Sequence, residues 1–300
     1  MTMNTHRQRN GERGVALLMA LWLLALMAAL AVAMATTART ESRLARNLVE
    51  EVRARAAAQA GVSHAILMLL DPKTQRRPGG SGVGKVTVDV LGSKLSIAVR
   101  DECGKIDINT GWGTLLSGLV RQHTSDEQAQ ALSQAILDWR DPDHRRRPRG
   151  AEDDDYASAR RLHGARDGPF ESVDELQQVL GMNAGLYARL ADDITIDCLN
   201  AGLDLRSASA ATLAAIPGLD TVALETFLRA RDAQANAQLP DLEGADEYTE
   251  ISPAQVFGIR AVAELPSGGR SAWQAIVWIT EDGSRPFLLR AWRQAGRENP

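Results

Sequence analysis

The amino-acid sequence predicts an α+β protein, in which a long N-terminal helix packs on an antiparallel sheet and a large all-α domain is inserted into that sheet. Three observations support this prediction. An uncharged run from Val15 to Ala35 leads directly into a charged helical pattern that ends near Leu70. Segments of alternating apolar and polar residues occur at 85–101 and again at 257–295. The segment between them has helical periodicity, and 300 residues are enough for both parts.

The N-terminal apolar run has the length of a membrane span. It contains no charged residue, Gly or Pro from Val15 to Ala35, and as a helix it would be about 31 Å long. Arg7, Arg9 and Arg13 precede it, which favours a cytoplasmic N-terminus and places the rest of the chain on the opposite side of the membrane.

A cleavable signal peptide is the alternative, because small residues in "AVAMA" suit a leader peptidase. The run is longer than a usual signal core, however, and no helix breaker follows it. We therefore expect one continuous helix from about Val15 to Leu70, half in the membrane and half as a stalk.

Turn-forming residues and alternating patterns predict a sheet built from both ends of the body. Asp71–Lys85 has the Pro, Gly and Ser content of a flexible loop. Strands are predicted at 85–90 and 94–101, with Gly92 and Ser93 forming a hairpin turn. Three more are predicted at 257–265, 271–282 and 286–295.

Between these strands the sequence predicts helices, at 125–139, 172–182, 183–193, 207–219 and 221–233. Ser172 and Glu175 have the spacing of a capping box. Two stretches, 168–196 and 203–233, repeat a pattern of capped helix, Gly turn and second helix, which is similar to SAM-like and helix-hairpin-helix modules that bind DNA. The formal net charge of −4 opposes binding to phosphates, so a helical packing module is the favoured interpretation and nucleic acid is not an expected partner.

A cluster of acidic residues follows the first predicted helix of the insert. It consists of Asp138, Asp141, Asp143, Glu152, Asp153, Asp154 and Asp155. Hard divalent cations such as Ca²⁺ take six to eight oxygen ligands, and carboxylates at alternate positions can converge on one ion. The alternative is a solvated loop whose charge is balanced by five arginines between positions 140 and 149. The residues alone leave both interpretations open.

The two cysteines and the remaining motifs give no sign of catalysis. Cys103 and Cys198 lack metal-ligand spacing; they would be separate thiols in a reducing compartment and could form a disulfide in an oxidising one. We find no G-x-S-x-G elbow, Gly-rich phosphate loop with Lys, or H-E-x-x-H motif. The sequence therefore predicts a structural protein rather than an enzyme.

The N-terminus resembles that of type IV pilins and pseudopilins. A short basic leader ends in Gly14, and the apolar run "VALLMALWLLALMAALAVA" begins at Val15. The resemblance implies that a prepilin peptidase cuts between these two residues and that Val15 is then N-methylated. It also implies a pilin-like arrangement of helix and sheet. Members of this group usually carry Glu at the fifth mature position, where this chain has Met19. Absence of that Glu is the habit of the minor pseudopilin K family of type II secretion systems.

Motifs in the body resemble the same family. They are "ILDWRDPD", "RPRGAEDDDY", "GPFESVDELQQVLGM" and "DECGKIDINT". In that family the acidic loop holds Ca²⁺, so the resemblance implies a set of metal ligands in this chain, namely Asp138, Asp141, Asp143, Glu152, Asp153 and Asp155.

The resemblance further implies a subunit at the tip of the pseudopilus that initiates or caps filament assembly for protein export. It would be a single-pass inner-membrane protein with its body in the periplasm, and its partners would be minor pseudopilins I and J. A minor pilin of a type IV pilus and an exported helix-hairpin-helix DNA-binding protein are the alternatives.

On this interpretation the chain has five parts. They are a leader at 1–14, a transmembrane segment at 15–38, a stalk with the first strands at 39–107, the inserted helical domain at 108–256 and the C-terminal strands at 257–300.

Overall fold

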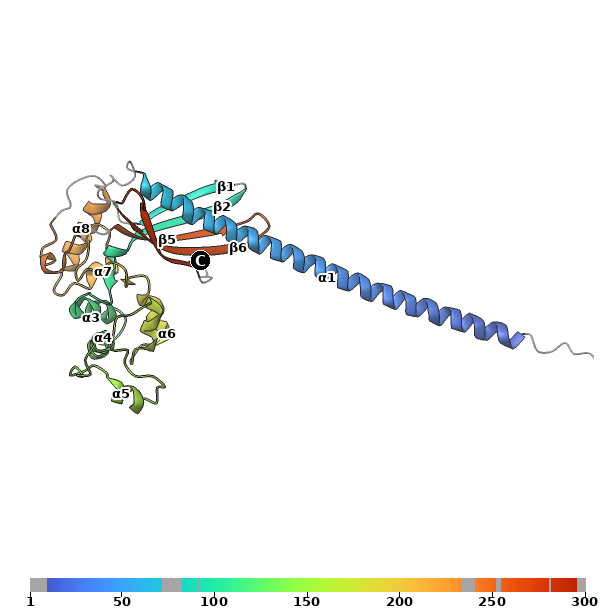
Figure 1. The fold of residues 1–300 in the computed structure, drawn as a ribbon, viewed down its shortest axis with the longest axis horizontal. Helices are drawn as coiled ribbons and strands as arrows, with labels where there is room; N and C mark the ends of the chain where they lie inside the picture. The colour runs from blue at the N-terminus through green and yellow to red at the C-terminus, as the bar shows by residue number, and fades with distance from the viewer. Residues whose placement is uncertain are drawn as a thin grey trace, which may run out of the picture.

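The computed structural model describes residues 10–71, 83–90, 92–233, 241–251, 255–280 and 282–295. Its first element is the single helix α1 (Asn10–Leu70), which confirms the predicted continuous helix and begins slightly before Val15. The C-terminal part of α1 lies across one face of a sheet, while the N-terminal half extends away from the body (Figure 1). The predicted loop at Asp71–Lys85 falls mostly outside the described residues.

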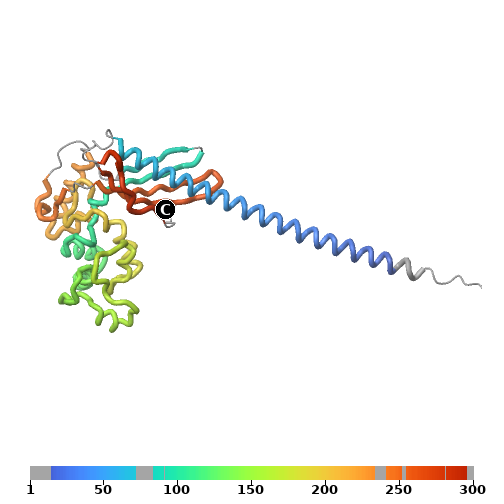
Figure 2. The backbone as a smooth tube through the Cα atoms, in the orientation of Figure 1, coloured from blue at the N-terminus to red at the C-terminus, as the bar shows by residue number. Residues whose placement is uncertain are grey.

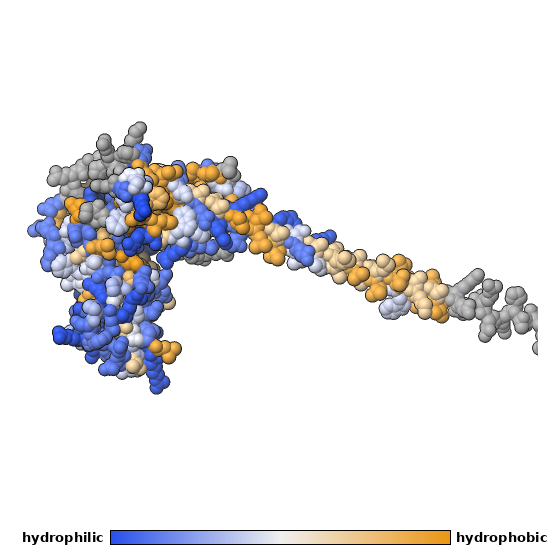
Figure 3. Space-filling model, in the orientation of Figure 1, coloured by the Kyte–Doolittle hydropathy of each residue, from blue (hydrophilic) through white to orange (hydrophobic). Residues whose placement is uncertain are grey.

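The exposed half of α1 carries the apolar run. Every side chain from Val15 to Val49 is exposed, and Figure 3 shows hydrophobic residues along this projecting segment. Its apolar stretch has a mean hydropathy of 2.7, so the helix is long and apolar enough to cross a membrane.

Where α1 reaches the sheet, its residues become small and buried. Ala54, Ala58, Val62 and Ala65 are at most 1% exposed and recur every three or four positions, on one face of the helix. Gly61 lies between them, and a Cβ at that position would be 3.0 Å from the Cβ of Ala261. Small side chains therefore let α1 approach the sheet closely.

The sheet has five antiparallel strands in the order β1-β2-β5-β6-β7. Their bounds are β1 (Val83–Val90), β2 (Ser93–Asp101), β5 (Gln255–Glu264), β6 (Arg270–Ile279) and β7 (Phe287–Gln294). These are the predicted strands, within a few residues at each end. β2 pairs with β5 across the insert: Asp101 lies opposite Phe257, which is 156 positions later in the sequence (257 − 101).

The core of this half lies between α1 and strands β2, β5 and β6. Its buried residues include Val62, Ile97, Ile259 and Val277. These strand residues alternate with more exposed ones, as expected for a sheet with one face covered.

The chain between β2 and β5 forms the helical domain. Its described elements are η1 (Glu102–Gly104), β3 (Ile106–Asp107), α3 (Gly113–Arg121), α4 (Asp126–Arg140), α5 (Asp153–Ser158), η2 (Val173–Gln178), α6 (Ala184–Leu190), β4 (Ile194–Thr195), α7 (Ala210–Ala214), α8 (Thr221–Ala233) and η3 (Asp246–Tyr248). It has a separate core, with Leu116, Ile136, Tyr156 and Leu190 among its buried residues. The tube in Figure 2 shows it at the end of the sheet away from the projecting half of α1.

One helical prediction needs correction. Residues 173–178 form the 3₁₀ helix η2, and the Ser172 side chain makes no capping hydrogen bond. The Glu175 carboxylate instead accepts the N–H of Glu171 at 3.3 Å and pairs with Arg166 at 3.3 Å. Because Glu175 is held by these groups, the reciprocal capping box does not form.

Two ion pairs join the two halves. From β7, Arg290 pairs with Asp197 at 3.2 Å and Arg293 pairs with Asp174 at 3.2 Å. Within the helical domain, β3 and β4 form a short parallel ladder, and Cys103 of η1, the first element after β2, forms a disulfide with Cys198 with a Cα–Cα distance of 5.0 Å. The base of the helical domain is therefore cross-linked covalently and is attached to the sheet by ion pairs.

Candidate metal centre

The acidic loop lies between α4 and α5, and these helices hold its two ends. α4 begins after Ser125, whose hydroxyl accepts the N–H of Gln128, and it carries Asp138 in its last turn. α5 begins after Glu152, and the Asp155 side chain accepts the N–H of Glu152 at 3.0 Å. Figure 1 places α5 at the end of the helical domain farthest from the sheet.

Arg147 folds back from the loop onto two of the predicted ligands. Its Nη1 donates to Oδ1 of Asp138 and to Oδ2 of Asp141, and its backbone N–H also points to the carboxylate of Asp138. Asp138 is 0% exposed. A Cβ at Gly150 would lie 1.8 Å from Oδ2 of Asp138, so the glycine allows this carboxylate its position.

Three other predicted ligands serve the backbone of the loop. Asp143 accepts the N–H of Arg145 at 2.8 Å, and Asp153 accepts the N–H of Ala165 at 3.0 Å. Asp155, besides its bond to Glu152, pairs with Arg146 at 3.1 Å. These hydrogen bonds order the loop, and the three side chains are not gathered around one point.

Glu152 differs from its neighbours because it is buried without a partner. It is 7% exposed, and neither of its carboxylate oxygens has a hydrogen-bond partner among the described residues. Burial, together with the charges of Asp138, Asp167 and Asp141, raises the pKa of Glu152 to about 7. The surroundings of Glu152 therefore favour the uptake of a positive charge, either a proton or a metal cation.

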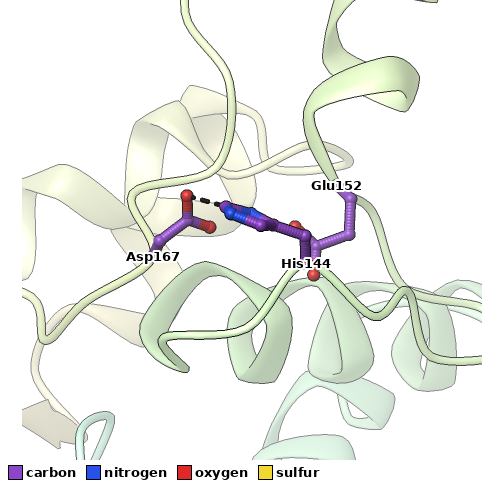
Figure 4. A group of neighbouring side chains, drawn as sticks. All are labelled: His144, Glu152 and Asp167. Carbon is purple, nitrogen blue, oxygen red and sulfur yellow. Dashed lines mark ion pairs between the residues drawn. The ribbon is translucent and has the colours of Figure 1, made fainter.

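Two residues outside the predicted ligand set face Glu152. Nδ1 of His144 lies 3.4 Å from Oδ2 of Asp167, and the buried Oδ1 of Asp167 has no hydrogen-bond partner in the part of the chain that the structure describes. One ligand atom each from His144, Glu152 and Asp167 lie within 4.8 Å of one another. Figure 4 shows the three side chains converging, with the dashed line marking the pair of His144 and Asp167.

An aromatic cluster packs beneath the loop. Trp139 stacks on Phe170 with ring centroids 6.0 Å apart and meets the edge of His163 at 5.8 Å. Tyr156 is fully buried, and its hydroxyl accepts the N–H of Leu180 at 3.1 Å. This apolar floor holds α4, α5 and the following loop at fixed positions.

These residues fit a divalent cation. Unpartnered, buried carboxylate oxygens on Glu152 and Asp167 are costly unless a cation or proton satisfies them. Of the predicted ligands, the structure brings together Asp138, Asp141 and Glu152, and the first two share Arg147. Asp143, Asp153 and Asp155 have other partners. Nothing in the sequence predicts Asp167 as a ligand, because it lies outside the acidic cluster and its neighbour Gly168 indicates only a turn.

The two residues at which cleavage is predicted lie in the first turns of α1. Gly14 and Val15 are both helical, and the Val15 side chain is 55% exposed. Met19, four residues further on, is 68% exposed. No neighbouring group in the described part of the chain covers this segment, since it projects from the body.

Comparisons with known proteins add to this picture. Residues 109–196, which include the acidic loop, match the family model described as "Type II secretion system (T2SS), protein K". A search of curated proteins finds no match. Among solved structures, a chain of the GspK-GspI-GspJ complex from the enterotoxigenic Escherichia coli Type 2 Secretion System is similar. The likeness covers 86% of this chain and 99% of that chain, with a TM-score of 0.56 and 17% identity, and is evidence of a shared fold.

Proposed function

We propose that this chain, a minor pseudopilin of the type II secretion protein K family, stands at the tip of the pseudopilus and initiates or caps filament assembly. Pseudopilins are structural parts of the secretion machinery. A subunit at the tip must join the filament on its membrane side and prevent a further subunit from adding on its other side. The arrangement of α1 and the helical domain supports such a role.

The position of the helical domain is the observation that carries this proposal. Subunits that align by their N-terminal helices must stack along the helix direction. The helical domain occupies the end of the body opposite the apolar half of α1 (Figure 1). The ion pairs from Arg290 and Arg293 of β7 attach it there, and the disulfide of Cys103 and Cys198 cross-links its base next to β2. A bulky domain fixed at this end leaves little room for another subunit.

The membrane arrangement follows from α1. Its apolar stretch would span the inner membrane, and the body would lie in the periplasm, where disulfides such as that of Cys103 and Cys198 form. A prepilin peptidase would cut between Gly14 and Val15, and Val15 would be methylated. Met19 is uncharged, so this position places no carboxylate in the lipid. An unpaired carboxylate there would be costly, so Met19 suits a subunit that has no neighbour above it to pair with.

The partners are proposed to be minor pseudopilins I and J, because the similar solved chain is part of a complex with GspI and GspJ. The stalk part of α1 offers a surface for them. Leu44, Leu48 and Val52 are 60%, 55% and 61% exposed and are spaced four residues apart, on one face of the helix. A neighbouring helix would cover this apolar row.

The acidic loop is proposed to hold Ca²⁺. Glu152 would bind the ion, with Asp138 and Asp141 beside it, and the wider predicted set adds Asp143, Asp153 and Asp155. When bound, the cation would neutralise the clustered carboxylates and tie the loop to α4 and α5.

Immunogold labelling tests the tip position. Pseudopili assembled with the full-length chain should carry gold at one end only, and label along the filament length would refute a capping role. As a companion measurement, mass spectrometry of the purified chain should show N-methylated Val15 as the first residue. An intact Met1, or a start near Thr36, would contradict prepilin processing.

Calcium binding is tested on the full-length chain in detergent after treatment with EDTA. Added Ca²⁺ should raise the melting temperature of the wild type, and Glu152→Gln should remove most of that increase. Asp154→Asn is the matched control, because Asp154 is an exposed carboxylate of the same loop. An increase that survives Glu152→Gln would place the ion elsewhere.

A further inference from the structure

We infer that the cation site of this chain is a mixed nitrogen and oxygen site formed by His144, Glu152 and Asp167, and that it accepts a first-row transition ion such as Zn²⁺. This inference rests on the proposal that the acidic loop binds a divalent cation. It differs in the ligands and in the class of ion. His144 and Asp167 are outside the set that the sequence predicts.

The buried carboxylate of Glu152 is the first reason to place a cation here. Glu152 is 7% exposed, and both of its carboxylate oxygens are buried, with no hydrogen-bond partner within the described ranges. Oδ1 of Asp167 is in the same condition. Because the two carboxylates face one another with His144 (Figure 4), a cation between them would satisfy oxygens that the fold leaves without a donor.

Two other carboxylates of the loop already have a positively charged partner. Asp138 and Asp141 are bound by Arg147, whose guanidinium provides the positive charge that these two carboxylates need. Ca²⁺ takes six to eight oxygen ligands, so the loss of these two weakens a calcium site. A site with few protein ligands suits Zn²⁺, which commonly binds three side chains and a water molecule.

The imidazole of His144 can supply a nitrogen ligand. The His144 side chain is 74% exposed, so a small rotation can bring a ring nitrogen to the ion at little cost in packing. The three ligand atoms already lie within 4.8 Å of one another. Imidazole suits Zn²⁺ and its neighbours, whereas Ca²⁺ prefers oxygen, so His144 should discriminate between the two classes of ion.

Metal titration of the full-length chain in detergent tests this inference. The EDTA-treated protein is titrated by calorimetry with Zn²⁺ and separately with Ca²⁺, and the visible absorption of added Co²⁺ reports nitrogen ligation. The wild type should bind one Zn²⁺ more tightly than Ca²⁺. His144→Gln should weaken Zn²⁺ binding at least tenfold and change the Co²⁺ spectrum, with less than a twofold effect on Ca²⁺.

Matched variants identify the ligands. Asp167→Asn keeps the backbone preference of the residue and should also weaken Zn²⁺ binding at least tenfold, as should Glu152→Gln. His123→Gln, at another exposed histidine of the same domain, should leave the affinity unchanged.

The titrations distinguish this inference from the proposal of calcium binding on which it rests. Calcium binding that depends on Glu152, with zinc no tighter or unaffected by His144→Gln, would overturn the mixed site and leave the calcium proposal standing. Absence of binding by either ion would overturn both.

Discussion

Replacing Arg147 with Met removes the positive charge that pairs with Asp138 and Asp141 while keeping most of the side-chain stem. Among the described residues, Asp138 would then keep only the long hydrogen bonds from the backbone N–H of residue 147, at 3.3 and 3.4 Å. Its carboxylate is fully buried and lies close to the charges of Asp141 and Glu152. The variant therefore leaves two neighbouring acids without their cation, beside Glu152.

The magnitude follows from the burial of the pair. Removing one partner of a buried ion pair typically costs about 3–5 kcal/mol, because the other charge stays buried and unpaired. Arg147 is 35% exposed, so water can reach the site and the low end applies, about 3 kcal/mol. For a domain of this size that corresponds to a fall in melting temperature of roughly 6–12 °C.

The assay is thermal unfolding of the full-length chain in detergent with EDTA, followed by circular dichroism. Arg146→Met is the matched control, because Arg146 is 55% exposed and pairs with the partly exposed Asp155; its loss should be below about 1 kcal/mol. Gly150→Ala should approach the effect of Arg147→Met, since its Cβ would displace the Asp138 carboxylate. If Arg147→Met is no less stable than Arg146→Met, the ion pair does not hold the loop.

Three further predictions concern other buried groups. Tyr156→Phe should lower the unfolding free energy by about 1–3 kcal/mol in urea titrations, because it leaves the buried N–H of Leu180 without an acceptor; an unchanged midpoint would contradict this. Burial raises the pKa of Asp101 from 3.8 to about 6, so the folded state binds the extra proton and stability falls as pH rises from about 4 through 6. Asp101→Asn should remove that fall and stabilise the protein by about 3 kcal/mol at pH 7, and an equally steep pH profile in the variant would argue against it. Replacing Cys103 and Cys198 with Ala should cost up to about 4–5 kcal/mol, and dithiothreitol should bring the wild type to the same midpoint without affecting the variant.

Much of the fold is predictable from local patterns. The apolar run from Val15 and the periodic segment after it predict one continuous helix that ends at Leu70, and α1 differs only in beginning at Asn10. The strands follow from alternation, since one face of the sheet is covered by α1. The prediction was wrong where a local motif had competing partners: Glu175 has the spacing of a capping box but is held by Arg166 and the N–H of Glu171.

The candidate metal centre is less predictable, because acidic residues in one segment need not converge. The sequence by itself determined the membrane-length helix, the strands at both ends of the body and the location of the acidic loop. Only the tertiary structure decided that Arg147 neutralises Asp138 and Asp141, and that His144 and Asp167 meet Glu152. The physical reason is that periodicity reports which face of an element is buried, whereas the neighbours of a loop side chain depend on how distant segments pack over a shared core, here the aromatic cluster around Trp139.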